Sequence, residues 1–477
     1  MPDLQAQVAA ELFLRSELLP REIEMWNKQS GQNQYGMGIH QSQVQAVTKL
    51  FEGMLKKQNG LKADLDPTKA VAMSPEEFTK KRLKLEQLLT GAHSIMATFR
   101  YIFSQRDATQ PYHAILDAAD LVAAYSYLPC MKLANRWKKE PDDRYREPPL
   151  IYLSAKLSPS AITRRHYFGL IGLELQGEME LKLPISVISL SYHDTEVFWA
   201  LSSIYHEVGH ILDQDLSLRA ELGSALQTKL GLSERNDLWH NTWLGEMIAD
   251  AFGVLLGGAG FAGALKGMLF KSREEVVDAS GGSPHPNSYV RIFLLGALLH
   301  RTGVDELKAL ADNIEADWKR LYGPAPQWDF FVADCKTVAE VLLTEPLEAL
   351  KQRCLLDFAR NNAELQNSPD LKKDHEHMKA VASHLRGKNT TEFDGAITQP
   401  ESLIRLVPAA AQLAAQDVST DHQNKFAALH KGALELILYL QEKANVEFLA
   451  DDPKAHEQYL DQLIEHLDFA ALEIERN

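Results

Sequence analysis

The sequence is poor in cysteine, in basic charge and in long hydrophobic runs. Its 477 residues include only three cysteines, which lie far apart and form no CxxC pair. This usage argues against a disulfide framework and favours a reducing compartment. The formal net charge of -15 lacks the basic excess that binding to nucleic acid or to an anionic membrane requires. We therefore expect neither of these partners.

An export signal and a membrane span are also not expected. The N-terminal segment carries Asp3 where a signal peptide has basic residues, and Glu11, Arg15 and Glu17 interrupt its apolar positions. The longest uncharged apolar stretch, residues 251–265, is shorter than the roughly 18 residues that cross a membrane. The sequence therefore predicts a cytoplasmic protein without a transmembrane segment.

Helical periodicity dominates both ends of the chain. The charged, proline-bearing segment KKEPDDRYREPP, residues 138–149, breaks this periodicity and is typical of a linker. A chain of this length is expected to form two or three domains. We predict a helical N-terminal region over residues 1–137, a catalytic domain over residues 150–325 and a helical C-terminal region over residues 337–477.

The middle of the chain favours short strands followed by a helix. Residues 150–153 and the alternating segment LPISVISLSY, residues 183–192, predict strands. A helix is expected from Thr195 to about Asp213, with an apolar stripe against a core and polar residues on the opposite face, toward a cleft. The predicted fold class is therefore mainly α with a small β-sheet, that is, α+β.

This helix contains the segment YHEVGH, which matches the HExxH pattern. A spacing of four residues places His206 and His210 on one helical face, where both imidazoles can bind one zinc ion. Glu207 lies beside the metal, where it can take a proton from zinc-bound water and later pass it to the leaving amine. The competing interpretation is a chance match on an ordinary helix, and the preceding strand and a compatible downstream helix favour the zinc site.

A catalytic zinc ion needs a third protein ligand and keeps a fourth position open. The HExxHxxGxxH pattern is absent, since Asp213 and Leu216 occupy the glycine position and the last histidine position. The segment WLGEMIADAFGVLL, residues 243–256, predicts a second amphipathic helix instead. It places Glu246 and Asp250 four residues apart on one face.

This acidic pair resembles the ExxxD motif of the gluzincins, the clan that includes thermolysin-like peptidases. The resemblance implies that Glu246 is the third zinc ligand and that Asp250 accepts the ring N–H of His206, which fixes the tautomer of that histidine. Glu221 and Asp213 are the alternative ligands. The competing interpretation is that both acids are ordinary charges on a helix surface.

Farther along, the segment SPHPNSYVRI, residues 283–292, resembles the His-Pro-x-x-x-x-Arg element of the CAAX-prenyl peptidase group and its soluble relatives. The resemblance implies that His285 stabilises the oxyanion of peptide hydrolysis. It also implies that Arg291 orients a ligand or binds a substrate carboxylate. Tyr289 is the alternative oxyanion donor, and a plain loop followed by a helix is the interpretation without function.

Together these residues predict a gluzincin-type zinc peptidase with one zinc ion per chain and zinc-bound water activated by Glu207. We expect a zincin-like core flanked by helical regions, and a peptide or protein substrate that adds to the edge of strand 183–192. Endopeptidase and oligopeptidase activity both fit, and the oligomeric state is open. The alternative is a non-hydrolytic zinc-binding regulatory or interaction protein with a gluzincin-like core. Glu207 favours the enzyme, because a structural zinc ion needs no base.

Overall fold

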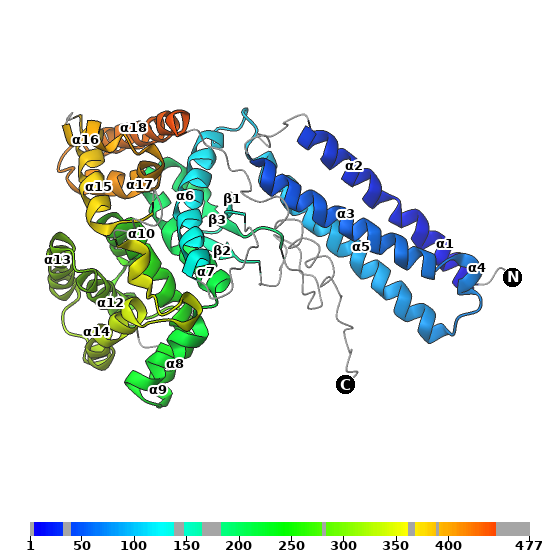
Figure 1. Ribbon diagram of the computed structural model, residues 1–477, viewed down its shortest axis with the longest axis horizontal. Helices are drawn as coiled ribbons and strands as arrows, with labels where there is room; N and C mark the ends of the chain where they lie inside the picture. The colour runs from blue at the N-terminus through cyan, green and yellow to red at the C-terminus, as the bar shows by residue number, and fades with distance from the viewer. Residues whose placement is uncertain are drawn as a thin grey trace.

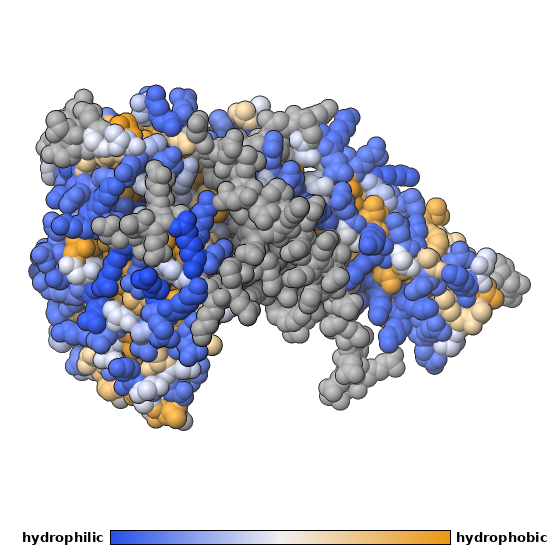
Figure 2. Space-filling view, viewed as in Figure 1, coloured by the Kyte–Doolittle hydropathy of each residue, from blue (hydrophilic) through white to orange (hydrophobic). Residues whose placement is uncertain are grey.

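The computed structural model describes residues 4–31, 40–137, 147–164, 183–278, 283–360, 368–387 and 391–444. The chain is mostly helical and contains one three-stranded sheet (Figure 1). The prediction of a mainly α fold with a small β-sheet is therefore confirmed at this level. The face shown in Figure 2 is largely hydrophilic over the described residues, as the charged composition leads one to expect.

The N-terminal helices form an elongated arm beside the rest of the molecule (Figure 1). They are α1 (Leu4–Ser16), α2 (Leu18–Gly31), α3 (Gln41–Asp64), α4 (Pro67–Ala70) and α5 (Pro75–Ser104). Local sequence sets the start of α5, because the Ser74 side chain accepts a hydrogen bond from the Glu77 backbone and Pro75 occupies the first turn. Trp26 packs edge-on against Phe51 and Phe103 in the arm, with ring centroids 5.6 Å apart in both pairs.

The sheet consists of β1 (Leu150–Ser154), β2 (Ser160–Ile162) and β3 (Val187–Ser191), in the order β1-β3-β2. Strand β1 runs parallel to β3, and β2 runs antiparallel to it. Every residue of β1 and β3 is buried, which matches the nearly continuous apolar runs of strands covered on both faces. The prediction that segment 183–192 offers a free edge is wrong, because β3 is the central strand. Within the described residues the free edge on that side belongs to β2.

The helix of the HExxH segment is α7 (Ser203–Leu216). It begins later than expected, because two 3-10 segments, residues 192–196 and 198–202, precede it. The predicted stripe is buried within α7, where Ile204, Val208 and Ile211 are fully covered. Ser217 then adopts a left-handed conformation with φ 58°, which ends α7 and leads into α8 (Arg219–Leu230).

The helix of the ExxxD segment is α10 (Leu244–Leu269), and it packs along α7. It bends at Gly258, whose φ of 48° favours glycine. Among the described helices, α10 is the one that is long and apolar enough to cross a membrane, and most of it is buried within the protein. Short segments α9 (Glu234–Asp237) and a π-turn over residues 238–242 lead into it.

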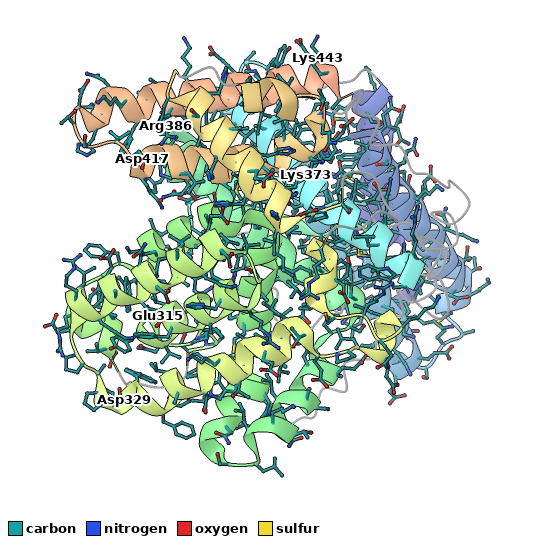
Figure 3. The ribbon with its side chains drawn as sticks, turned by 60° about the vertical axis from the view of Figure 1, so that its left-hand side comes forward. Glu315, Asp329, Lys373, Arg386, Asp417 and Lys443 are labelled. Carbon is teal, nitrogen blue, oxygen red and sulfur yellow. The ribbon has the colours of Figure 1, made fainter. Side chains whose placement is uncertain are left out.

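Helices α12 to α15 and α17 pack against α10, and α6, α11, α16 and α18 lie farther out in the same part of the molecule (Figures 1 and 3). Their bounds are α6 (His113–Trp137), α11 (Arg273–Val277), α12 (Ser288–Arg301), α13 (Asp305–Tyr322), α14 (Asp329–Thr344), α15 (Leu371–Leu385), α16 (Thr391–Ala396), α17 (Pro400–Gln416) and α18 (His422–Lys443). Arg386 and Asp417 form an ion pair between the ends of α15 and α17 (Figure 3).

Two apolar clusters underlie this arrangement. The smaller cluster joins the N-terminal arm to one face of the sheet. The larger cluster runs from α6 to α18 and includes α7 and α10. The three predicted regions stay predictions, but α6 and the C-terminal helices share one apolar core with the residues of the predicted catalytic domain. The predicted helical C-terminal region ends with α18 among the described residues, and residues 445–477 lie outside them.

Candidate metal centre

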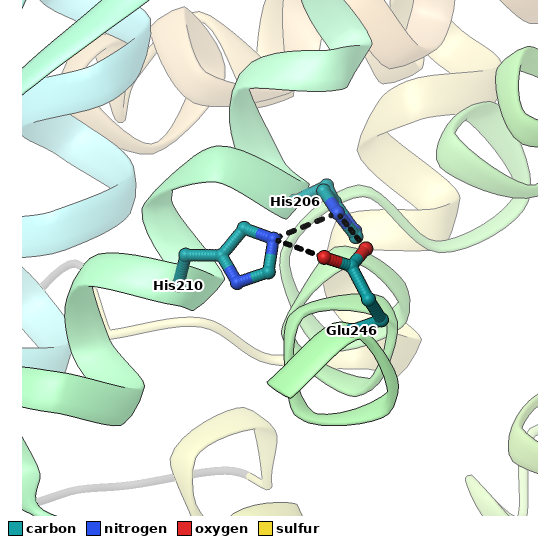
Figure 4. A group of neighbouring side chains, drawn as sticks. All are labelled: His206, His210 and Glu246. Carbon is teal, nitrogen blue, oxygen red and sulfur yellow. Dashed lines mark hydrogen bonds and ion pairs between the residues drawn. The ribbon is translucent and has the colours of Figure 1, made fainter. Parts of the chain in front are cut away.

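Helices α7 and α10 bring three potential metal ligands together (Figure 4). The Nε2 atoms of His206 and His210 lie 3.1 Å apart on one face of α7, as their spacing predicts. Glu246, in the first turn of α10, places one carboxylate oxygen 3.2 Å from His206 Nε2 and the other 3.3 Å from His210 Nε2. Glu246, which lies 36 positions after His210 and 40 positions after His206, therefore meets both histidines at one point.

The distances fit a tetrahedral zinc ion. Ligand atoms about 2.0 to 2.1 Å from such an ion lie about 3.3 Å from one another. The two imidazole nitrogens lie 3.1 Å from each other and 3.2 and 3.3 Å from the nearest carboxylate oxygen of Glu246, which is close to this value. Two imidazole nitrogens and one carboxylate also match the donor set of catalytic zinc sites, which keep a fourth position for water or substrate.

Asp250, which is only 1% exposed, contacts the His206 ring on the side away from the other two potential ligands. Its Oδ1 atom lies 2.9 Å from Nδ1 of His206, so the opposite nitrogen of the ring faces the other two ligands. Burial disfavours a charged imidazole, but the contacts with Asp250 and Glu246 prevail and raise the pKa of the metal-free His206 ring to about 9. A metal ion at this position would therefore displace a proton.

Arg291, from α12, holds Asp250 in turn. Its Nε and Nη2 atoms donate to the two carboxylate oxygens of Asp250, each over 2.7 Å. Arg291 is 3% exposed, and its charge counters the effect of burial and keeps the pKa of Asp250 low, at about 2. The sequence left two roles open for Arg291, and this buried bidentate pair favours orientation of the ligands over binding of a substrate carboxylate.

Glu207 and His285 face the same cavity of about 340 Å³. Glu207 is 6% exposed, and no hydrogen bond or ion pair with another described residue occupies its carboxylate. His285 is half-exposed, and its Nδ1 atom lies 2.7 Å from the Glu246 carboxylate. The structure thus brings together all seven residues singled out from the sequence: His206, Glu207, His210, Glu246, Asp250, His285 and Arg291.

Comparison with known proteins does not add a family. No family model, no curated protein and no solved structure matches the chain. The resemblance to gluzincins therefore stays a prediction from the motif residues.

The alternative residues considered from the sequence have other partners. Asp213 pairs with Arg219, and Glu221 accepts hydrogen bonds from the backbone at the start of the 3-10 segment 348–350. The Tyr289 hydroxyl donates to the Gly323 carbonyl over 3.1 Å, and the residue is 4% exposed. None of these three side chains belongs to the ligand group formed by His206, His210 and Glu246.

Within the described part of the chain, one other side-chain group could hold a metal ion. It consists of His40, Asp117 and Asp120, which come from the start of α3 and from α6. There Arg106 donates to both carboxylate oxygens of Asp120, over 2.7 to 3.0 Å, so a protein cation already neutralises this carboxylate. The group on α7 and α10 is the better candidate, because the nearest guanidinium nitrogen, Nη2 of Arg291, lies 3.8 Å from the Glu246 carboxylate and outside hydrogen-bond distance.

Sequence reasoning missed two walls of the cavity. One is β2 with its flanking residues, and the other is formed by Arg219 and Gly245. A strand of only three residues shows no alternation that could reveal it. Arg219 follows a helix end without a recognisable pattern, and its position depends on tertiary contacts alone.

Proposed function

We propose that the protein is a zinc-dependent peptidase with a zincin-like core of the gluzincin type and one zinc ion per chain. The observation that carries this proposal is the convergence of the His206, His210 and Glu246 side chains, with contacts of 3.1 to 3.3 Å, beside the unpaired carboxylate of Glu207. A zinc ion held by His206, His210 and Glu246 supplies Lewis-acid chemistry, which polarises a carbonyl group and acidifies water. A structural zinc site would have no use for the carboxylate of Glu207.

The residues around the ligands supply the remaining chemistry. The Glu207 carboxylate takes a proton from the attacking water, whose oxygen bonds to the carbonyl carbon of the substrate. When the carbon–nitrogen bond breaks, the same carboxyl group delivers that proton to the amine nitrogen. His285 faces the cavity, where its imidazole can donate to the oxyanion formed between these steps. Arg291 and Asp250 hold the His206 ring in position throughout.

The substrate proposed is an extended peptide. Ser160 and Ala161 of β2 line the cavity, and β2 pairs with β3 along one side only within the described residues. A peptide can therefore add to the outer edge of β2 by main-chain hydrogen bonds. The edge of β2 thus replaces the edge of segment 183–192 as the proposed binding site for the peptide. The three cysteines are free and buried, which agrees with the proposed cytoplasmic location.

Cleavage of a peptide library by zinc-loaded protein tests the proposal. We expect about one zinc ion per chain in the wild type, which a His206→Ala, His210→Ala double variant loses together with activity. Glu207→Gln should keep zinc and lower the rate of hydrolysis by roughly 10²- to 10⁴-fold, because the base is lost while the ligands remain. Unchanged zinc in the double variant would refute the metal site. Bound zinc without hydrolysis of any peptide would favour a non-hydrolytic zinc-binding protein.

A further inference from the structure

Arg219 is a cation in the wall of the candidate active site. It is the first residue of α8, and it lines the same cavity as His206, Glu207 and Glu246. Its side chain is 52% exposed. Among the residues that line the cavity, Arg219 alone carries a permanent positive charge, whereas Glu207 and Glu246 are acidic. Arg219 is therefore the residue of this lining that is best suited to bind an anionic group of a substrate.

The Arg219 side chain lies between Asp213 and Gly245. Its Nε atom donates to the buried carboxylate of Asp213, at the end of α7. On the other side its guanidinium lies against the backbone of Gly245, where an added Cβ would come within 2.3 Å of Nη2 and 2.7 Å of Cζ. The absence of a Cβ at Gly245 leaves room for the guanidinium in this position, and the next residue in the chain is Glu246. The guanidinium thus lies beside the neighbour of a candidate metal ligand.

The hydrogen-bonding capacity of Arg219 is largely unused. The contact with Asp213 uses Nε, and the two terminal amino groups make no other hydrogen bond or ion pair within the residues that the structure describes. A guanidinium with two such amino groups binds a carboxylate through parallel hydrogen bonds. In a protein with a net charge of -15, an anionic substrate group needs a local cation of this kind.

We propose that Arg219 selects peptides that carry a carboxylate close to the scissile bond. This proposal rests on the proposed peptidase function and names its substrate class. The carboxylate has two possible sources, which share the same chemistry. It is either the C-terminal carboxylate of a short peptide or the side chain of an aspartate or glutamate next to the cleaved bond.

Matched peptides distinguish the two sources. One pair carries Glu or Gln next to the cleaved bond, and the other pair ends in a free carboxylate or an amide. For the wild type we expect kcat/KM to favour the charged member of one pair by roughly 10- to 100-fold, the range for hydrogen bonds to a charged group. The preferred pair identifies the source of the carboxylate.

Variants of Arg219 test whether this residue causes the preference. Arg219→Gln should abolish the preference in kcat/KM for charged over neutral peptides. Arg219→Lys should keep part of this preference, because lysine keeps the charge without the planar fork. Arg320→Gln is the matched control, since Arg320 is exposed on α13 and pairs with Asp317 outside the cavity. If Arg219→Gln fails to fold because Asp213 is left unpaired, the Asp213→Asn, Arg219→Gln double variant, which removes both charges, is used in place of the single variant.

A binding measurement separates this proposal from the peptidase proposal. Zinc-loaded Glu207→Gln protein, with and without Arg219→Gln, is titrated with the same fluorescent peptides, and the ratio of dissociation constants is measured by anisotropy. If Arg219→Gln abolishes the difference in affinity between charged and neutral peptides, the assignment is supported even when no peptide is hydrolysed. Equal affinity and equal kcat/KM for charged and neutral peptides would overturn this proposal, and so would a preference that persists in Arg219→Gln. Neither result would contradict the peptidase proposal if the wild type hydrolyses peptides.

Discussion

Replacing Asp250 with alanine should affect folding and zinc binding by separable amounts. Asp250 accepts hydrogen bonds from His206 over 2.9 Å and from two nitrogens of Arg291 over 2.7 Å each. Without zinc, the substitution leaves the buried Arg291 with only a longer ion pair, to Glu246 at 3.8 Å. Removing one member of a buried ion pair costs about 3 to 5 kcal/mol. We expect the free energy of unfolding of the zinc-free protein to fall by this amount.

With zinc, a second loss should appear. The His206 ring no longer has an acceptor for its Nδ1 proton, and such a change typically weakens metal binding about 10- to 100-fold. This factor corresponds to about 1.4 to 2.7 kcal/mol at a saturating zinc concentration. The destabilisation measured with zinc should therefore exceed the destabilisation without zinc by that difference.

Chemical denaturation with and without zinc, together with zinc competition against a chromophoric chelator, measures both quantities. Asp312→Ala is the control, because Asp312 also contacts a histidine, His300, but in an exposed pair whose loss costs little. The Asp250→Ala, Arg291→Met double variant should recover folding stability but not zinc affinity, since it removes the unpaired charge without restoring the acceptor. Equal zinc affinity in Asp250→Ala and the wild type would refute the role assigned to Asp250.

Two further predictions concern histidines. His285→Ala should keep zinc and lower kcat by roughly 10²- to 10³-fold with little change in KM, as expected for an oxyanion donor; zinc loss would show that the contact with Glu246 matters instead. His40 is buried, and burial lowers its pKa to about 4, below the unfolded value of 6.5. The unfolded state therefore binds the proton first, so this contribution to stability is complete above pH 6.5 and is lost as the pH falls toward 4. His40→Gln should reduce the difference in unfolding free energy between pH 7 and pH 5 by about 2 kcal/mol; an unchanged difference would contradict this.

The parts of the site that the sequence predicted depend on local periodicity. The spacing of four residues in α7 and in α10 fixes which side chains share a helical face, and the structure places them so. The likeness to gluzincins supplied the link between Asp250 and His206, which lie 44 positions apart. The structure has the two nitrogens of His206 directed at Asp250 and Glu246.

The parts that the sequence did not predict depend on contacts between distant segments. A short β-like run identified β1 and alternation identified β3, but neither gave the strand order, because the pairing of β2 with β3 is decided by packing. The start of α7 was placed too early, since Ser191 and Asp194 form a capping box that begins a 3-10 segment instead. Arg219 was missed for the same kind of reason, because its place in the cavity wall depends on its approach to Gly245, which lies 26 positions farther along the chain.

Gly209, one of the two unspecified positions of the HExxH segment, explains how the third ligand reaches the other two. A Cβ atom at Gly209 would lie 2.8 Å from the Ala249 Cα and 2.9 Å from its carbonyl oxygen, so the backbones of α7 and α10 touch at this point. Glu246 and Asp250 flank Ala249 on α10 and contact the two imidazoles and His206, respectively. A side chain at Gly209 would force the helices apart and lengthen these contacts beyond the separation of about 3.3 Å that a tetrahedral zinc ion bridges. Because the ligands come from two helices, the glycine between Glu207 and His210 contributes to the geometry of the metal site although it carries no ligand atom.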